Sequence, residues 1–154
     1  MEVILGTAQL AQFRKRLSKK RIGYFLRSLA EMGDLRIDTA PLYSSLDSER
    51  IIGEWLPEVD YPNIGISTKF GLNFSNLPFP LNRFHQKITL NKKNLDGFTW
   101  PIDLERELLG SLSRLQRSKL DTFFMHQLQN VNFRNSSFSI LEDLKKRNLI
   151  NNIG

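Results

Sequence analysis

Five short apolar runs, separated by segments with helical spacing, constrain the fold of this chain more than any other feature. The runs lie at residues 3–5, 35–37, 63–68, 120–125 and, only just begun, 150–153. Between them, apolar side chains recur every three or four residues, as at Ile22, Phe25, Leu26, Leu29 and at Leu104, Leu108, Leu112, Leu115. Strands that alternate with helices in this way predict an α/β fold with a parallel sheet and right-handed crossovers.

Polar residues stand where three of these runs stop. Asp38, Lys69 and His126 each follow a run directly, and Tyr43 lies five residues after Asp38. If the runs are parallel strands, the four side chains collect at the carboxyl-terminal rim of the sheet, where α/β barrels carry out chemistry. An acid, a lysine, a tyrosine and a histidine together suggest proton transfer to a carbonyl oxygen.

Each of these four residues also has an ordinary structural interpretation. Asp38 suits a turn, Tyr43 a half-buried aromatic position, Lys69 a solvated strand end and His126 a structural histidine. Taken singly, Tyr43 and His126 favour the structural interpretation. Taken together at one rim, the four favour a functional origin.

Composition and motifs exclude several other classes. There is no cysteine, so no disulfide framework or thiolate zinc site can form, and we expect a cytoplasmic protein without a metal centre. No secretory signal opens the chain, and no stretch approaches the roughly 20 apolar residues of a membrane span. No glycine-rich dinucleotide fingerprint or phosphate-binding loop follows the first run.

The net charge of +6 comes from clustered lysines and arginines, for example at residues 14–16, 19–21 and 145–147. Such a surface can attract nucleic acid. No nucleic-acid motif accompanies the clusters, so we interpret them as solvated loops and helix ends and expect no nucleic-acid partner.

Four segments of this chain together resemble the aldo-keto reductase family. They are residues 5–9, residues 37–43 with 48–53, residues 67–71, and residues 111–115 followed by Leu120, Asp121 and His126. The resemblance implies a partial (β/α)8 TIM barrel, about the first four βα units with the start of a fifth strand, in a single domain over residues 1–154. At residue 44 the family usually has glycine, whereas this chain has serine.

The resemblance also implies roles for the four rim residues. Members of the family are oxidoreductases that reduce small carbonyl substrates with a nicotinamide cofactor, usually NADPH. Tyr43 would be the general acid, Lys69 would stabilise its phenolate, Asp38 would fix Lys69, and His126 would orient the substrate oxygen. The assignment is physically coherent, because a free tyrosine titrates near ~10 and a neighbouring ammonium stabilises the phenolate.

The resemblance leaves Gly6, Thr7 and Asp38 as plausible cofactor contacts. Most of the family's other contacts to NADPH would follow residue 154, so we expect NADPH binding by this chain to be weak or absent. The alternative function is a truncated, catalytically inactive homologue that acts as an interaction module or is a gene remnant.

A partial barrel also leaves sheet edges open, and we expect a possible homo-oligomer that forms through them. On the same argument, apolar residues that a closed barrel would bury should be partly uncovered. We expect Ile37, Ile66 and Phe124 to be among them.

Overall fold

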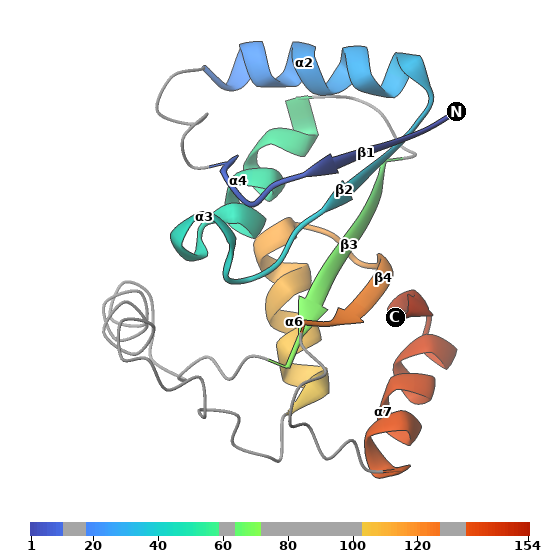
Figure 1. Cartoon of the computed structure of the whole chain (residues 1–154). Helices are drawn as coiled ribbons and strands as arrows, with labels where there is room; N and C mark the ends of the chain where they lie inside the picture. The colour runs from blue at the N-terminus through green and yellow to red at the C-terminus, as the bar shows by residue number, and fades with distance from the viewer. Residues whose placement is uncertain (11–17, 59–63, 72–102, 127–134) are drawn as a thin grey trace.

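The computed structural model describes residues 1–10, 18–58, 64–71, 103–126 and 135–154, and in this part of the chain the strands form one parallel sheet (Figure 1). The strands are adjacent in chain order and comprise β1 (Glu2–Gly6), β2 (Asp34–Asp38), β3 (Gly65–Phe70), β4 (Leu120–Met125) and β5 (Ile150–Ile153). The register pairs Gly6 with Asp38, Asp38 with Ser67, and Lys69 with Phe124. The parallel α/β sheet that the sequence predicts is confirmed.

Helices follow the strands as the periodicity predicts. They are α2 (Lys19–Met32), α3 (Tyr43–Leu46), α4 (Ser48–Trp55) with the short 3-10 turn η1 (Leu56–Glu58), α6 (Leu104–Leu115) and α7 (Asn135–Lys146). Side chains cap the amino-terminal ends of α2 and α6, since Ser18 accepts from the Arg21 N–H at 3.4 Å and Asp103 accepts from the Arg106 N–H at 3.0 Å. Residues 87–90, whose sequence could form a small strand of its own, lie outside the described residues. No helix in the described ranges is long and apolar enough to cross a membrane.

The helices cover one face of the sheet (Figure 1). Alternate strand residues point toward them and are buried, among them Leu35, Ile37, Ile66, Phe70 and Phe123. They pack against the apolar stripes of the helices, which include Ile22, Leu26, Ile51, Ile52, Trp55, Leu104, Leu108, Leu112, Leu115, Leu141 and Leu144. Burial of these side chains is the main source of the stability of the layer.

The expectation that Ile37, Ile66 and Phe124 are partly uncovered is wrong for two of these residues. Ile37 and Ile66 are 1% and 2% exposed, so they face the helices and are not uncovered. Because successive strand residues point to opposite faces, the open face instead carries Asp38 and Ser67. Only Phe124, at 37% exposure, meets the expectation.

Candidate active site

The rim at the carboxyl ends of the strands brings the four predicted residues together. Asp38 ends β2, Lys69 is the last residue but one of β3, His126 directly follows β4, and Tyr43 opens α3. Asp38 pairs with Ser67 across the sheet, and Lys69 lies two residues beyond Ser67 on the same face. The sheet register therefore turns Asp38 and Lys69 toward each other.

The Lys69 ammonium is fully engaged by oxygen acceptors. Its Nζ donates to Asp38 Oδ1 at 2.8 Å, to Asp38 Oδ2 at 2.9 Å and to the Thr39 carbonyl oxygen at 2.9 Å. These three bonds use all three donors of the ammonium and fix its position. The Lys69 side chain is 17% exposed and that of Asp38 is 36% exposed, so the pair lies at the surface of the rim.

Tyr43 contacts both Lys69 and His126. Lys69 Nζ lies 4.8 Å from the centroid of the Tyr43 ring, within the range of a cation–π contact. The Tyr43 and His126 ring centroids are 6.1 Å apart in an edge-to-face arrangement. The four side chains thus form one connected group, Asp38–Lys69–Tyr43–His126.

The loop that carries Tyr43 depends on an unusual backbone at the next residue. Ser44 has a φ of 54°, in the left-handed region where a side chain adds strain and glycine does not. Its hydroxyl donates to the Thr7 carbonyl oxygen at 3.3 Å, which offsets part of that strain. Glycine, which the family resemblance leads us to expect at this position, would adopt this conformation without that strain.

His126 is held by its backbone and has a perturbed imidazole. Its N–H donates to the Phe70 carbonyl oxygen at 2.9 Å, which ties the end of β4 to the end of β3. Burial, and secondly the Lys69 ammonium, lower the pKa of His126 below its ordinary value, while the Asp38 carboxylate opposes that shift. His126 is therefore mainly neutral at pH 7. Within the described ranges, its Nδ1 is buried and has no hydrogen-bond partner.

Gly6 and Thr7, the other predicted cofactor contacts, differ in their access to the rim. Gly6 is exposed, and a Cβ added there would meet no atom of the described residues within 4 Å. Thr7 is 1% exposed, and its hydroxyl donates to the Asp38 carbonyl oxygen at 3.0 Å and accepts from Ser48 at 2.9 Å. The Thr7 side chain therefore supports Asp38 from behind the rim.

Sequence reasoning missed two interactions behind β3. Glu49 of α4 accepts from the Thr68 hydroxyl at 2.6 Å, and Glu107 of α6 accepts from the Gly71 N–H at 3.0 Å. Both acids lie on the sides of their helices that face β3. For Glu107, a charged residue between the apolar positions Leu104 and Leu108 was the available signal.

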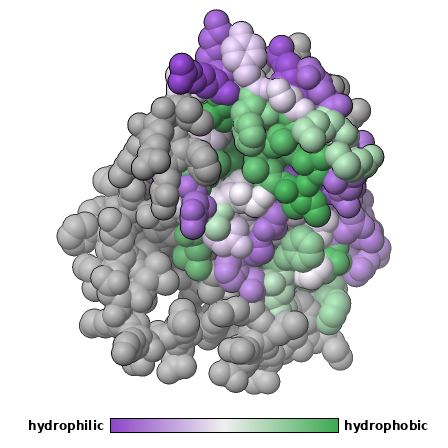
Figure 2. Space-filling model, turned by 45° about the horizontal axis from the view of Figure 1, so that its top comes forward, coloured by the Kyte–Doolittle hydropathy of each residue, from purple (hydrophilic) through white to green (hydrophobic). Residues whose placement is uncertain are grey.

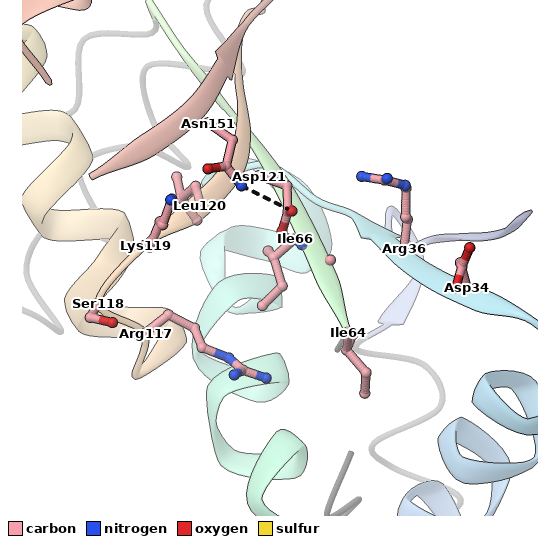
Figure 3. Close-up of a pocket in the computed structure, with 11 residues that line it drawn as sticks. Asp34, Arg36, Ile64, Ile66, Arg117, Ser118, Lys119, Leu120, Asp121 and Asn151 are labelled. Carbon is pink, nitrogen blue, oxygen red and sulfur yellow. Dashed lines mark hydrogen bonds between the residues drawn. The ribbon is translucent and has the colours of Figure 1, made fainter. Parts of the chain in front are cut away.

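A separate hollow of about 420 Å³ lies at the amino-terminal ends of the strands (Figure 3). Its lining includes Arg36, Arg117 and Lys119 but also Asp34 and Asp121. Asp121 is engaged, since it accepts from the Ile66 N–H at 2.7 Å and from Asn151 at 3.4 Å. None of the four rim residues lines this hollow, and its charges of opposite sign largely cancel.

The described residues contain no cluster of three or more histidine, aspartate or glutamate side chains that could hold a metal ion. The charged groups of the rim are instead paired with each other.

A parallel sheet whose strands alternate with helices along the chain, and with polar residues gathered at the carboxyl ends of the strands, defines part of a (β/α)8 barrel. The chain belongs to the aldo/keto reductase family, whose model matches residues 2–154.

Solved structures of aldo-keto reductases share the fold. One from Pseudomonas aeruginosa has a TM-score of 0.65 and 22% identity, with 98% of this chain and 53% of that chain covered. The holo form of one from Bacillus halodurans has a TM-score of 0.66 and 20% identity, with 99% and 45% covered. One from Klebsiella pneumoniae in complex with NADPH has a TM-score of 0.65 and 18% identity, with 98% and 44% covered. The chain thus spans about half the length of these structures. A comparison with curated proteins finds no match.

Proposed function

We propose that the rim is the catalytic site of an oxidoreductase of aldo-keto reductase type, which reduces a small carbonyl substrate. The observation that carries the proposal is the position of Lys69, bonded to both carboxylate oxygens of Asp38 and 4.8 Å from the ring centre of Tyr43. This arrangement places a cation next to a phenol, as a tyrosine general acid requires.

The four residues have complementary roles. Tyr43 donates its proton to the carbonyl oxygen of the substrate, and the Lys69 ammonium stabilises the phenolate that remains. Asp38 and the Thr39 carbonyl hold Lys69 in place. His126 is mainly neutral and lies beside Tyr43, so it can hydrogen-bond the substrate oxygen without competing as a cation.

The nicotinamide cofactor, which we propose to be NADPH, supplies the hydride when bound. The related structure from Klebsiella pneumoniae is in complex with NADPH, which supports this choice. Gly6 and Asp38 are adjacent across the sheet, and no atom of the part of the chain that the structure describes would lie within 4 Å of a Cβ at Gly6, which leaves room for a ligand there. The contribution of Thr7 is to hold Asp38 through the two bonds that it donates to the Asp38 carbonyl oxygen.

The alternative function is a catalytically inactive homologue that serves as an interaction module. Two observations favour it. The chain spans about half the length of the similar structures, and within the described residues β1 and β5 each pair on one side only. We accordingly propose weak NADPH binding and a possible homo-oligomer through these edges. We also propose that residues 1–154 form one domain and, from the cysteine-free composition alone, that the location is cytoplasmic.

NADPH titration by calorimetry, combined with reduction of a panel of small aldehydes at high NADPH concentration, tests the two functions. We expect binding weaker than micromolar, because each lost contact of ~1.4 kcal/mol weakens binding about tenfold. We also expect slow reduction that Tyr43→Phe abolishes. Tyr24→Phe is the matched control, because Tyr24 is 56% exposed on α2. No reduction by the wild-type chain would overturn the catalytic proposal in favour of the inactive homologue.

A further inference from the structure

Two acids from two different helices accept hydrogen bonds from the end of β3, one from the helix-facing side of the strand and one from the residue that follows it. Lys69 points toward the open face, whereas its neighbours Thr68 and Phe70 point toward the helices and are buried. The Thr68 hydroxyl donates to Glu49 Oε1 at 2.6 Å, and the Gly71 N–H donates to Glu107 Oε2 at 3.0 Å. The two acids therefore hold the strand on either side of Lys69.

Glu49 is a buried carboxylate whose two oxygens each accept a hydrogen bond. It is 2% exposed, and its Oε2 accepts from Arg114 Nε at 2.7 Å. Arg114 also donates to the Ser111 hydroxyl at 3.2 Å. Because a buried carboxylate is stable only when paired, this bond fixes α4, α6 and Thr68 relative to one another.

Glu107 is a partly buried carboxyl group that accepts a hydrogen bond from the Gly71 N–H. Burial raises its pKa to about 7, and the proximity of Asp103 and Glu49 acts in the same direction. The bond from Gly71 and the charge of Arg114 oppose that shift. Within the described ranges, Arg114, Asp103 and Glu49 are the charged groups that act on Glu107. Because the pKa of Glu107 is about 7, its ionisation changes the strength of the Gly71 bond near neutral pH.

Gly71 is connected to the rim residues through the backbone of the end of β3. Gly71 has a φ of 96°, which a residue with a side chain rarely adopts, and it lies two residues after Lys69. Between them, the Phe70 carbonyl oxygen accepts the His126 N–H at 2.9 Å. A displacement of the strand at Gly71 would therefore move both Lys69 and His126.

We propose that Glu107 is a positioning residue for the rim, and that it holds Lys69 and His126 through the Gly71 amide while Glu49 holds Thr68. The structural part of this proposal concerns the strand alone. Its catalytic consequence rests on the proposed function.

Backbone and histidine NMR of the full chain tests the proposal with two substitutions of one residue. Glu107→Ala removes the acceptor, and we expect the amide signals of Lys69, Gly71 and His126 and the pKa of His126 to shift. Glu107→Gln keeps an acceptor oxygen, so we expect it to restore the Lys69 and His126 signals while Gly71 no longer titrates near neutral pH. Glu105→Ala is the matched control, because Glu105 lies on the same helix and pairs with Arg147 at 2.6 Å at the surface.

Activity is the second readout. If the chain reduces aldehydes, we expect Glu107→Ala to lower kcat roughly ten- to hundredfold with little change in KM, and Glu107→Gln to recover most of it. Absence of turnover in every variant would count against the proposed function and leave the NMR result to decide the positioning role. A folded Glu107→Ala variant whose Lys69 and His126 signals match the wild type would overturn the positioning role.

Discussion

The ammonium of Lys69 interacts with each of the other three rim residues. It donates to Asp38, lies over the Tyr43 ring and lowers the pKa of His126. Loss of this one charge should therefore change the electrostatics of the whole rim, since the Asp38–Lys69 pair is partly buried and is screened less than a fully exposed pair.

We predict that Lys69→Met raises the pKa of His126. The Lys69 charge lowers that pKa and the Asp38 charge raises it, so removal of the cation leaves the carboxylate unopposed. An NMR titration of the His126 imidazole in both proteins measures the change. Lys145→Met, on the exposed last turn of α7, is the control and should leave the pKa unaltered. An unchanged or lower pKa in Lys69→Met would contradict the prediction.

The raised pKa of Glu107 makes the free energy of unfolding depend on pH. Its pKa is about 7 in the folded chain and 4.5 for an ordinary glutamate, so the folded state binds more protons between these values. We predict that the free energy of unfolding falls as pH rises from about 4.5 to 7, by on the order of 2 kcal/mol.

Urea unfolding at several pH values measures this fall. Glu107→Gln should lack it, whereas Glu105→Gln should retain it. The contribution of His126, whose pKa is lowered, opposes the trend but is common to all three proteins and cancels in the differences between them. Equal slopes for wild type and Glu107→Gln would refute the assignment.

At the scale of elements, α6 ends at a residue with a left-handed backbone conformation. Gln116 closes α6 with a φ of 54° and a ψ of 44°, and its N–H donates to Ser113 at 3.3 Å. The side chain of Gln116 is exposed, so it contributes little packing to compensate for this left-handed conformation.

We predict that Gln116→Gly stabilises the chain by about 0.5–1 kcal/mol. Glycine adopts the left-handed region without the strain of a Cβ, although it also gains entropy in the unfolded state, which limits the effect. The midpoint of urea unfolding checks this, with Gln116→Ala as a control that should change stability little. A lower midpoint for the glycine variant would show that the cap is not strained.

At the scale of the whole molecule, the open face of the sheet and its edges dominate the behaviour of a chain of these 154 residues. Ile4 of β1 is 65% exposed and Phe124 of β4 is 37% exposed. Figure 2 shows a hydrophobic area bordered by hydrophilic residues on the face that it displays. Apolar surface next to an unpaired strand edge favours association.

We predict that the purified chain self-associates in a concentration-dependent manner, as measured by sedimentation velocity. Ile4→Lys should weaken association, because a charged side chain on an edge strand opposes pairing with another strand. Ile140→Lys is the control, since Ile140 is 41% exposed on α7 rather than on the sheet edge. A single monomeric species at all concentrations would show that the edges are protected in another way.

The sequence by itself determined the strands, their parallel arrangement and the residues at their carboxyl ends. Asp38, Lys69 and His126 could be placed at one rim because each directly follows an apolar run, and periodicity is a local property of the chain. Tyr43 could be placed near them because only a short loop separates it from Asp38.

Only the tertiary structure decided which face of the sheet the helices cover. That choice buries Ile37 and Ile66 and leaves Asp38 and Ser67 on the open face. It also decided the partners of Glu49 and Glu107, because Arg114 and Gly71 are 65 and 36 residues away from them in the chain. The physical reason is that burial and long-range hydrogen bonds depend on how distant segments pack, which no local pattern in the sequence records.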